Sequence, residues 1–182
     1  SMVGGDGNDQ LYASDGNNTV DAGNGDDYMV LGAGRDTVDG GVGNDVIYGG
    51  ASADRLLGGD GSDQLYGQTG NDFIMGGTGT DTMDGSYGTD TIDYSFGALG
   101  GFINLTTQTA TIDGTAETFV SFENANGSAG SDTITGSTVN NVLNGLGAND
   151  TITGGDGNDT IDGGSENDTL SGDAGNDSIN GG

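Results

Sequence analysis

Aspartate residues that could bind a metal ion recur every nine residues along most of this chain. Each ends a glycine-rich turn of the form Gly-Gly-x-Gly-x-Asp, as in residues 154–159. Glycine tolerates positive φ, so such a turn can be tight and can point carbonyl oxygens inward, and the Asp adds an anionic oxygen. Oxygen atoms of these two kinds are the ligands that calcium prefers. We therefore interpret each turn as half of a calcium site.

The three residues after each turn have the pattern of a short β-strand. In Thr160-Ile161-Asp162 a large aliphatic residue stands between two polar ones. Because side chains alternate across a strand, Ile161 is expected to point inward and its neighbours outward. A strand of three residues cannot fold alone, so the repeats must stack on one another.

The repeat keeps its register over long stretches. Ten nonapeptides run without insertion from residue 4 to residue 93, and six more start at residue 127. A flexible acidic, Gly-rich linker would not keep both the sixth-position Asp and the eighth-position aliphatic residue, so the periodicity favours a repetitive fold. The predicted metal ligands are the sixth-position aspartates Asp9, Asp27, Asp36, Asp45, Asp54, Asp63, Asp72, Asp81, Asp90, Asp132, Asp150, Asp159, Asp168 and Asp177.

One segment interrupts the repeats. Residues 94–117 lose the period and carry two β-rich runs, 101–105 and 109–112, separated by a Thr-rich bend, which predicts a β-hairpin. The next nine residues, 118–126, fit the repeat weakly and predict a degenerate coil. The expected organisation is a tag remnant or array start at 1–3, a first block at 4–93, the insertion at 94–117 and a second block at 118–182.

The composition makes cations a requirement of the fold. Twenty-nine acidic residues face only Arg35 and Arg55, which gives a formal net charge of -27, and only 30% of the residues are hydrophobic. Such a chain would be disordered without counter-ions. The absence of Cys and His excludes disulfides and the usual zinc ligands, and no apolar run is long enough for a membrane span. The negative charge also argues against nucleic acid and anionic lipids as partners.

The repeats resemble the Gly-Gly-x-Gly-x-Asp-x-U-x signature of the RTX (repeats-in-toxin) family, in which U is a large aliphatic residue. Sixteen full repeats, 144 of the 182 residues, carry the resemblance. It implies an all-β fold, a right-handed parallel β-roll with two nonapeptides per coil and calcium between stacked turns. It also implies type I secretion from a Gram-negative bacterium to the cell surface or medium. The sequence departs from the pattern at Asn18 and Asn141, which replace the Asp, and at Ser52, which replaces a turn glycine.

The family geometry stacks each repeat on the second repeat after it, so sixth-position residues 18 apart should lie about 4.8 Å from each other. Ten such pairs consist of two aspartates, and ten divalent ions would bring the formal charge from -27 to -7. We therefore expect about ten calcium ions. Magnesium is less suitable because it demands strict octahedral geometry and loses its water reluctantly.

No complete catalytic motif occurs, so the module itself is not expected to be an enzyme. The leading hypothesis is a structural and secretion scaffold within a larger secreted protein, which folds on calcium binding outside the cell. One alternative is a polysaccharide-binding regulatory module, since similar repeats occur in mannuronan C5-epimerases, although two Arg residues are few for an anionic chain. Another is a surface-layer or adhesin module that assembles with calcium.

Tyrosines gather on one predicted outer face of the first block. Tyr12, Tyr48 and Tyr66 occupy ninth positions of alternate repeats, and Tyr28 joins them from a seventh position. These rings are expected to form a cross-strand ladder or to be covered by the 94–117 hairpin or a neighbouring domain. The alternative is a partner-binding face on which sugar rings or a protein could stack.

Overall fold

The computed structural model describes all 182 residues, which form an all-β solenoid of mostly parallel strands without a helix. The structure thus contains no helix that is long and apolar enough to cross a membrane. The chain divides into two compact units. Unit 1 comprises Ser1–Thr91 with Thr118–Ser121, and unit 2 comprises Ile92–Glu117 with Phe122–Gly182.

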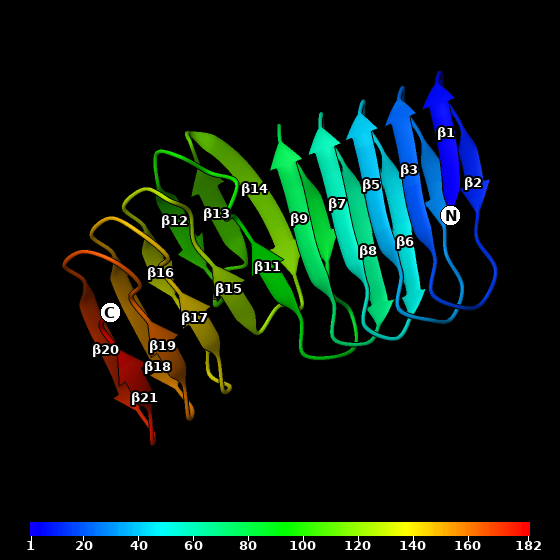
Figure 1. Cartoon of the computed structure of the whole chain (residues 1–182). Coiled ribbons are helices and arrows are strands. Elements are labelled where there is room, and N and C mark those ends of the chain that lie inside the picture. Colours follow the sequence, from blue (N-terminus) through cyan, green and yellow to red (C-terminus); the bar gives the residue numbers. More distant parts are fainter. The chain divides into compact units, whose positions relative to one another are not determined.

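Unit 1 consists of two parallel sheets whose strands alternate along the chain (Figure 1). Sheet A contains β1 (Met2–Asp6), β3 (Thr19–Asn24), β5 (Thr37–Val42), β7 (Arg55–Asp60) and β9 (Phe73–Thr78), in that order. Sheet B contains β2 (Gln10–Tyr12), β4 (Tyr28–Val30), β6 (Val46–Ala51), β8 (Gln64–Thr69) and β10 (Thr82–Asp84), followed by the end of β14 (Thr115–Val120).

Unit 2 repeats this arrangement. Sheet A contains the end of β11 (Thr91–Asp93), then β15 (Asn124–Asn126), β17 (Val142–Asn144), β19 (Thr160–Asp162) and β21 (Ser178–Asn180). Sheet B contains β13 (Thr109–Ile112), β12 (Gly101–Asn104), β16 (Thr133–Thr135), β18 (Thr151–Asp156) and β20 (Thr169–Ala174).

The strands pair in parallel with a register of 18 residues. Val20 lies opposite Val38 in sheet A, and Ile47 lies opposite Leu65 in sheet B. Two nonapeptides therefore make one coil, and the parallel β-roll expected from the sequence is confirmed. Like residues stack on like within the repeats, because equivalent repeat positions face each other across their parallel strand pairs.

The eighth-position side chains form the core between the two sheets. Ile47, Leu56 and Leu65 are fully buried, as are Ile74 and Leu143 in other coils. Burying one such side chain stabilises the fold by about 1.5–3 kcal/mol. Each coil buries only two of them, so the hydrophobic core is thin.

The interruption is incorporated into the roll of unit 2. β12 and β13 pair antiparallel as the expected hairpin, and β12 also pairs in parallel with β16, where Ile103 lies opposite Ile134. Ile103 thereby takes a core position and is fully buried. In the weak repeat that follows, Ala125 lies opposite Leu143 and is also fully buried.

Candidate metal sites

The sixth-position aspartates stand in columns along the roll. Within a column, Oδ1 of each Asp after the first accepts the backbone N–H of the Asp 18 residues earlier. The N–H of Asp45 donates to Oδ1 of Asp63 at 2.7 Å, and the N–H of Asp63 donates to Oδ1 of Asp81 at 2.8 Å. All fourteen predicted ligands belong to such columns: 9, 27, 45, 63 and 81; 36, 54, 72 and 90; 132, 150 and 168; and 159 and 177.

The second carboxylate oxygen has no hydrogen-bond donor in most of these residues. A buried ionised oxygen without a donor or a cation is strongly unfavourable, since nothing replaces the water that it loses on folding. This arrangement repeats from coil to coil, so the unpartnered oxygens are a property of the repeat. The Oδ2 atoms that are buried without a partner include those of Asp9, Asp27, Asp36, Asp45, Asp54, Asp63, Asp72, Asp150, Asp159 and Asp168.

Asn18 shows what normally faces the sixth-position side chain. Its amide nitrogen Nδ2 donates to the carbonyl oxygens of Ser14 and Gly16, each at 2.7 Å. These two residues hold the second and fourth positions of the same turn. Where Asp replaces Asn, the amide group becomes a carboxylate oxygen, so turn carbonyls and carboxylate would present acceptors only. A cation satisfies such a set of oxygens.

In most turns the first position is a glycine, which leaves room for the carboxylate. A Cβ placed on Gly4 would lie 2.6 Å from Oδ2 of Asp9 and 2.5 Å from the carbonyl oxygen of Ala22 in the next coil. A Cβ on Gly49 would lie 2.9 Å from Oδ2 of Asp54. The carboxylate oxygen and a backbone carbonyl oxygen therefore converge beside this glycine.

Burial alters the acidity of the columns. It is the largest cause of the raised pKa of Asp54 and Asp63, to about 7 in each, and of Asp45 and Asp150, to about 6 in each. The donated backbone N–H opposes this effect, and neighbouring carboxylates of the column add to it. The ionised form of these groups therefore needs a compensating charge at neutral pH.

The oxygen set fits calcium only if the backbone contributes. No three or more acidic side chains converge on one point. Each site must then combine one or two carboxylates with turn carbonyl oxygens, a set that suits the six to eight oxygen ligands of calcium. The unpartnered Oδ2 atoms and the turn carbonyls described above meet this requirement.

Two positions depart from the common arrangement. Asp132 has a partner for its Oδ2 atom, which accepts the backbone N–H of Ser128 at 2.6 Å and the Ser128 hydroxyl at 3.0 Å. Asn141 accepts the N–H of Ser137 at 2.7 Å and donates to the carbonyl oxygen of Glu123. Both side chains are satisfied by protein groups, so these positions have less need of an ion.

Sequence reasoning missed two hydrogen-bond roles. It assigned the carboxylates to metal alone, whereas Oδ1 holds the backbone of the preceding coil. It also passed over the fifth position, where side chains cap the backbone of the next coil. Oδ1 of Asp26, for example, accepts the N–H of Asn44, and Oδ1 of Asn44 accepts the N–H of Ser62, both at 2.8 Å. The recurrence of Asn and Asp at this position was the available signal.

The predicted tyrosine face is a ladder on the outside of sheet B. The rings of Tyr48 and Tyr66 stack at 4.8 Å with an interplanar angle of 10°, and Tyr28 lies between Tyr12 and Tyr48 at centroid distances of 6.3 and 5.8 Å. The stacked rings cover each other's faces, so they contribute to cross-strand packing. A partner-binding role for Tyr12, Tyr48 and Tyr66 stays a prediction.

Comparison with family models gives matches over both blocks of repeats. The matching model describes the RTX calcium-binding nonapeptide repeat, four copies per model, and it matches residues 3–38, 31–65, 66–98, 126–161, 135–170 and 153–182. No curated protein matches the chain.

Proposed function

Because the chain belongs to the RTX calcium-binding nonapeptide repeat family, we propose that it is a calcium-folded β-roll module of a larger secreted bacterial protein. The main support for this proposal is the pair of hydrogen bonds that the Asn18 side chain makes. Its amide donates to two turn carbonyls, at the point where the other repeats of its column place a carboxylate oxygen. The aspartate repeats therefore need a cation where Asn18 needs none.

The fourteen aspartates of the columns would hold the ions together with carbonyl oxygens of the turns. Bound calcium supplies positive charge that neutralises the buried carboxylates and so joins successive turns. The ten all-Asp pairs support about ten ions, with fewer or weaker sites where Asp132 and Asn141 already have protein partners. Ion binding then contributes stabilisation that the thin core does not supply.

This coupling supports a role in secretion. Extracellular calcium modules bind at about 10⁻⁴ to 10⁻³ M, so the chain would remain unfolded at cytosolic calcium levels and fold outside the cell. An unfolded chain can pass through a type I secretion channel of a Gram-negative bacterium, and a folded one outside can serve as a rigid scaffold. The module acts structurally in this proposal and carries no catalytic step.

The test is a calcium titration of the isolated chain. Far-UV circular dichroism and small-angle scattering should show an expanded, unstructured chain in chelator and a compact β-rich one in millimolar calcium. Magnesium at the same concentration is the control and should leave the chain largely unfolded. A compact β-rich state that persists in chelator would refute the proposal.

A further inference from the structure

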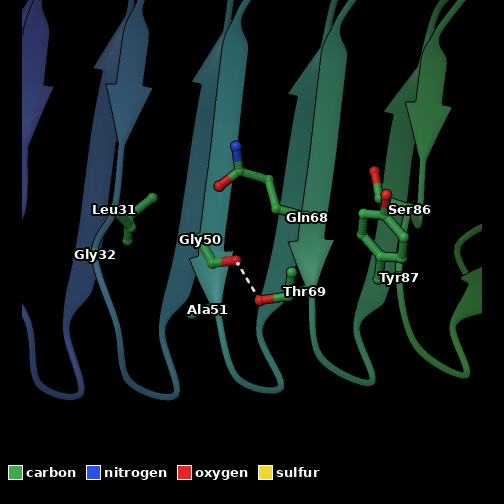
Figure 2. Close-up of a pocket in the computed structure, with 8 residues that line it drawn as sticks. All are labelled: Leu31, Gly32, Gly50, Ala51, Gln68, Thr69, Ser86 and Tyr87. Carbon is green, nitrogen blue, oxygen red and sulfur yellow. Dashed lines mark hydrogen bonds between the residues drawn. The ribbon is translucent and has the colours of Figure 1, made fainter.

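A groove of about 600 Å³ lies on unit 1, where sheet B turns into the loops of four successive coils. It crosses the first three positions of the repeats that start at residues 31, 49, 67 and 85. Figure 2 shows Leu31 and Gly32 at one end, Gly50 and Ala51 in the middle and Ser86 and Tyr87 at the other end. The groove is therefore a short open channel along the axis of the roll.

The four second-position residues of the groove are two glycines and two residues that carry a side chain. Gly32 and Gly50 keep the glycine of the repeat and contribute only backbone to the lining, because a Cβ at either position would press against the backbone of the preceding coil. The next two coils carry Gln68 and Ser86 at this position, in the left-handed region at φ 75° and 66°. A residue with a side chain is less stable than glycine in that conformation, so both side chains are present at the expense of some stability.

The lining offers neutral polar groups and one free ring. Gln68 contributes an amide, Thr69 and Ser86 contribute hydroxyls, and the Tyr87 side chain is 79% exposed. Unlike the tyrosines of the ladder, Tyr87 leaves its ring faces open to a ligand. The lining contains no charged side chain.

The charges around the groove define its ligand further. Asp84 lies beside it, with Oδ1 accepting the N–H of Ser86 at 2.8 Å, and neither Arg35 nor Arg55 lines the groove. The Asp84 carboxylate at the rim repels anionic polymers. The lining itself has no acidic side chain that could pair with a cationic ligand. Amide and hydroxyl groups beside an aromatic ring match a ligand that carries many hydroxyls and one apolar face, which is the chemistry of a sugar.

We propose that this groove binds a short segment of an uncharged polysaccharide. Gln68 and Ser86 form hydrogen bonds to sugar hydroxyls, and the ring of Tyr87 stacks on the apolar face of one sugar. Three strand spacings of about 4.8 Å separate the first and last coils of the groove, so it accommodates more than one sugar unit. This role goes beyond calcium-dependent folding and uses none of the residues of the aspartate columns.

The proposal is tested by titrating neutral hexasaccharides (cellohexaose, xylohexaose, mannohexaose and maltohexaose) into the calcium-loaded chain by calorimetry. At least one should bind, and a hyaluronan hexasaccharide, which is anionic, should not. Gln68→Gly and Tyr87→Ala should each weaken binding about tenfold, the effect of losing one good polar or stacking contact. Gln68→Gly restores the residue of the repeat, so it relieves backbone strain and leaves the fold intact.

Asp173→Gly in unit 2 is the matched control. Asp173 holds the same second position with φ 62°, so the substitution relieves the same strain far along the sequence from the groove, and sugar binding should not change. Circular dichroism of each variant in calcium reports folding separately, so a failure of calcium-dependent folding is distinguishable from a failure of sugar binding. The proposal is overturned if a folded chain binds no neutral hexasaccharide, if both groove variants bind like the parent, or if the anionic sugar binds more tightly.

Discussion

The substitution Asp63→Asn should have opposite effects with and without calcium. Asp63 is 1% exposed, its Oδ1 accepts the N–H of Asp45 at 2.7 Å, and its Oδ2 has no partner. Asparagine keeps the Oδ1 acceptor and places an amide group where Oδ2 stands. By analogy with Asn18, that amide would donate to the carbonyl oxygens of Gly59 and Gly61 in its own turn.

The magnitudes follow from these contacts. Without calcium, the variant replaces a buried unpartnered oxygen, which costs about 1–3 kcal/mol, so the folded state should gain on the order of that amount. With calcium, the variant loses or weakens the sites to which Asp63 contributes. One site at a calcium concentration 100 times its Kd contributes about 2.7 kcal/mol, so the calcium-loaded variant should be less stable by about that amount.

Two measurements check this pair of effects. The calcium-free chain is folded with trimethylamine oxide in chelator, and Asp63→Asn should need less of this osmolyte than the parent. Calorimetry should show fewer or weaker calcium sites, with a lower thermal midpoint in calcium. Asp60→Asn is the matched control, because it removes the same charge from an exposed residue whose Oδ1 accepts only the Thr78 hydroxyl at 2.7 Å. The reasoning is refuted if Asp63→Asn needs as much osmolyte as Asp60→Asn, or if its calcium binding is unchanged.

Three further predictions concern protons, weak sites and glycines. Burial raises the pKa of Asp54 and Asp63 to about 7, so the folded metal-free state binds more protons than the unfolded state. The free energy of unfolding of the metal-free state should therefore rise as the pH falls from about 7 toward 4, and this contribution should be lost as the pH rises through 7. Calcium competes with these protons, so calorimetry near pH 6.5 in buffers of different ionisation enthalpy should detect proton release, and affinity that is independent of pH between about 5 and 8 would contradict this. The sites that pair Asn18 with Asp36 and Asn141 with Asp159 should fill last in crystals grown at limiting calcium, and Asn141→Asp should add binding capacity; equal occupancy at all sites would argue against it. Gly58→Ala places a Cβ against Oδ2 of Asp63 and the carbonyl oxygen of Gly76, so it should lower the free energy of unfolding of the calcium-loaded chain by about 2 kcal/mol or more. Thermal unfolding in calcium measures this effect. Gly181 has open space around it, so Gly181→Ala is the control and should leave the thermal midpoint unchanged.

The periodic part of the structure could be predicted from sequence because each repeat position has one environment. Ile47 and Leu65 lie in the core because the eighth position always points inward, and the aspartates fall into columns because the period is constant. The hydrogen bond from the Asp45 N–H to Asp63 could not be predicted, since it depends on a side-chain conformation and not on spacing.

Departures from the period were harder to interpret. The spacing of residues 94–117 predicted a hairpin, but only the structure shows β12 pairing with β16 and placing Ile103 in the core. The groove was missed for a related reason. Gln68 and Ser86 look like ordinary substitutions of a turn glycine, and their effect depends on Gly32 and Gly50 lying next to them in space.

The register of 18 residues makes the parity of the repeat number decisive. Removing the nonapeptide 49–57 would carry every later repeat of the first block to the opposite sheet, because consecutive repeats alternate between sheets A and B. The core and the aspartate columns would survive, since every repeat supplies both. Tyr66 and Gln68, however, would leave the face that they share with Tyr48 and Gly32. Loss or duplication of two nonapeptides keeps every residue in its own sheet. An array of this kind therefore keeps its two surfaces only if its length changes by whole coils of two nonapeptides.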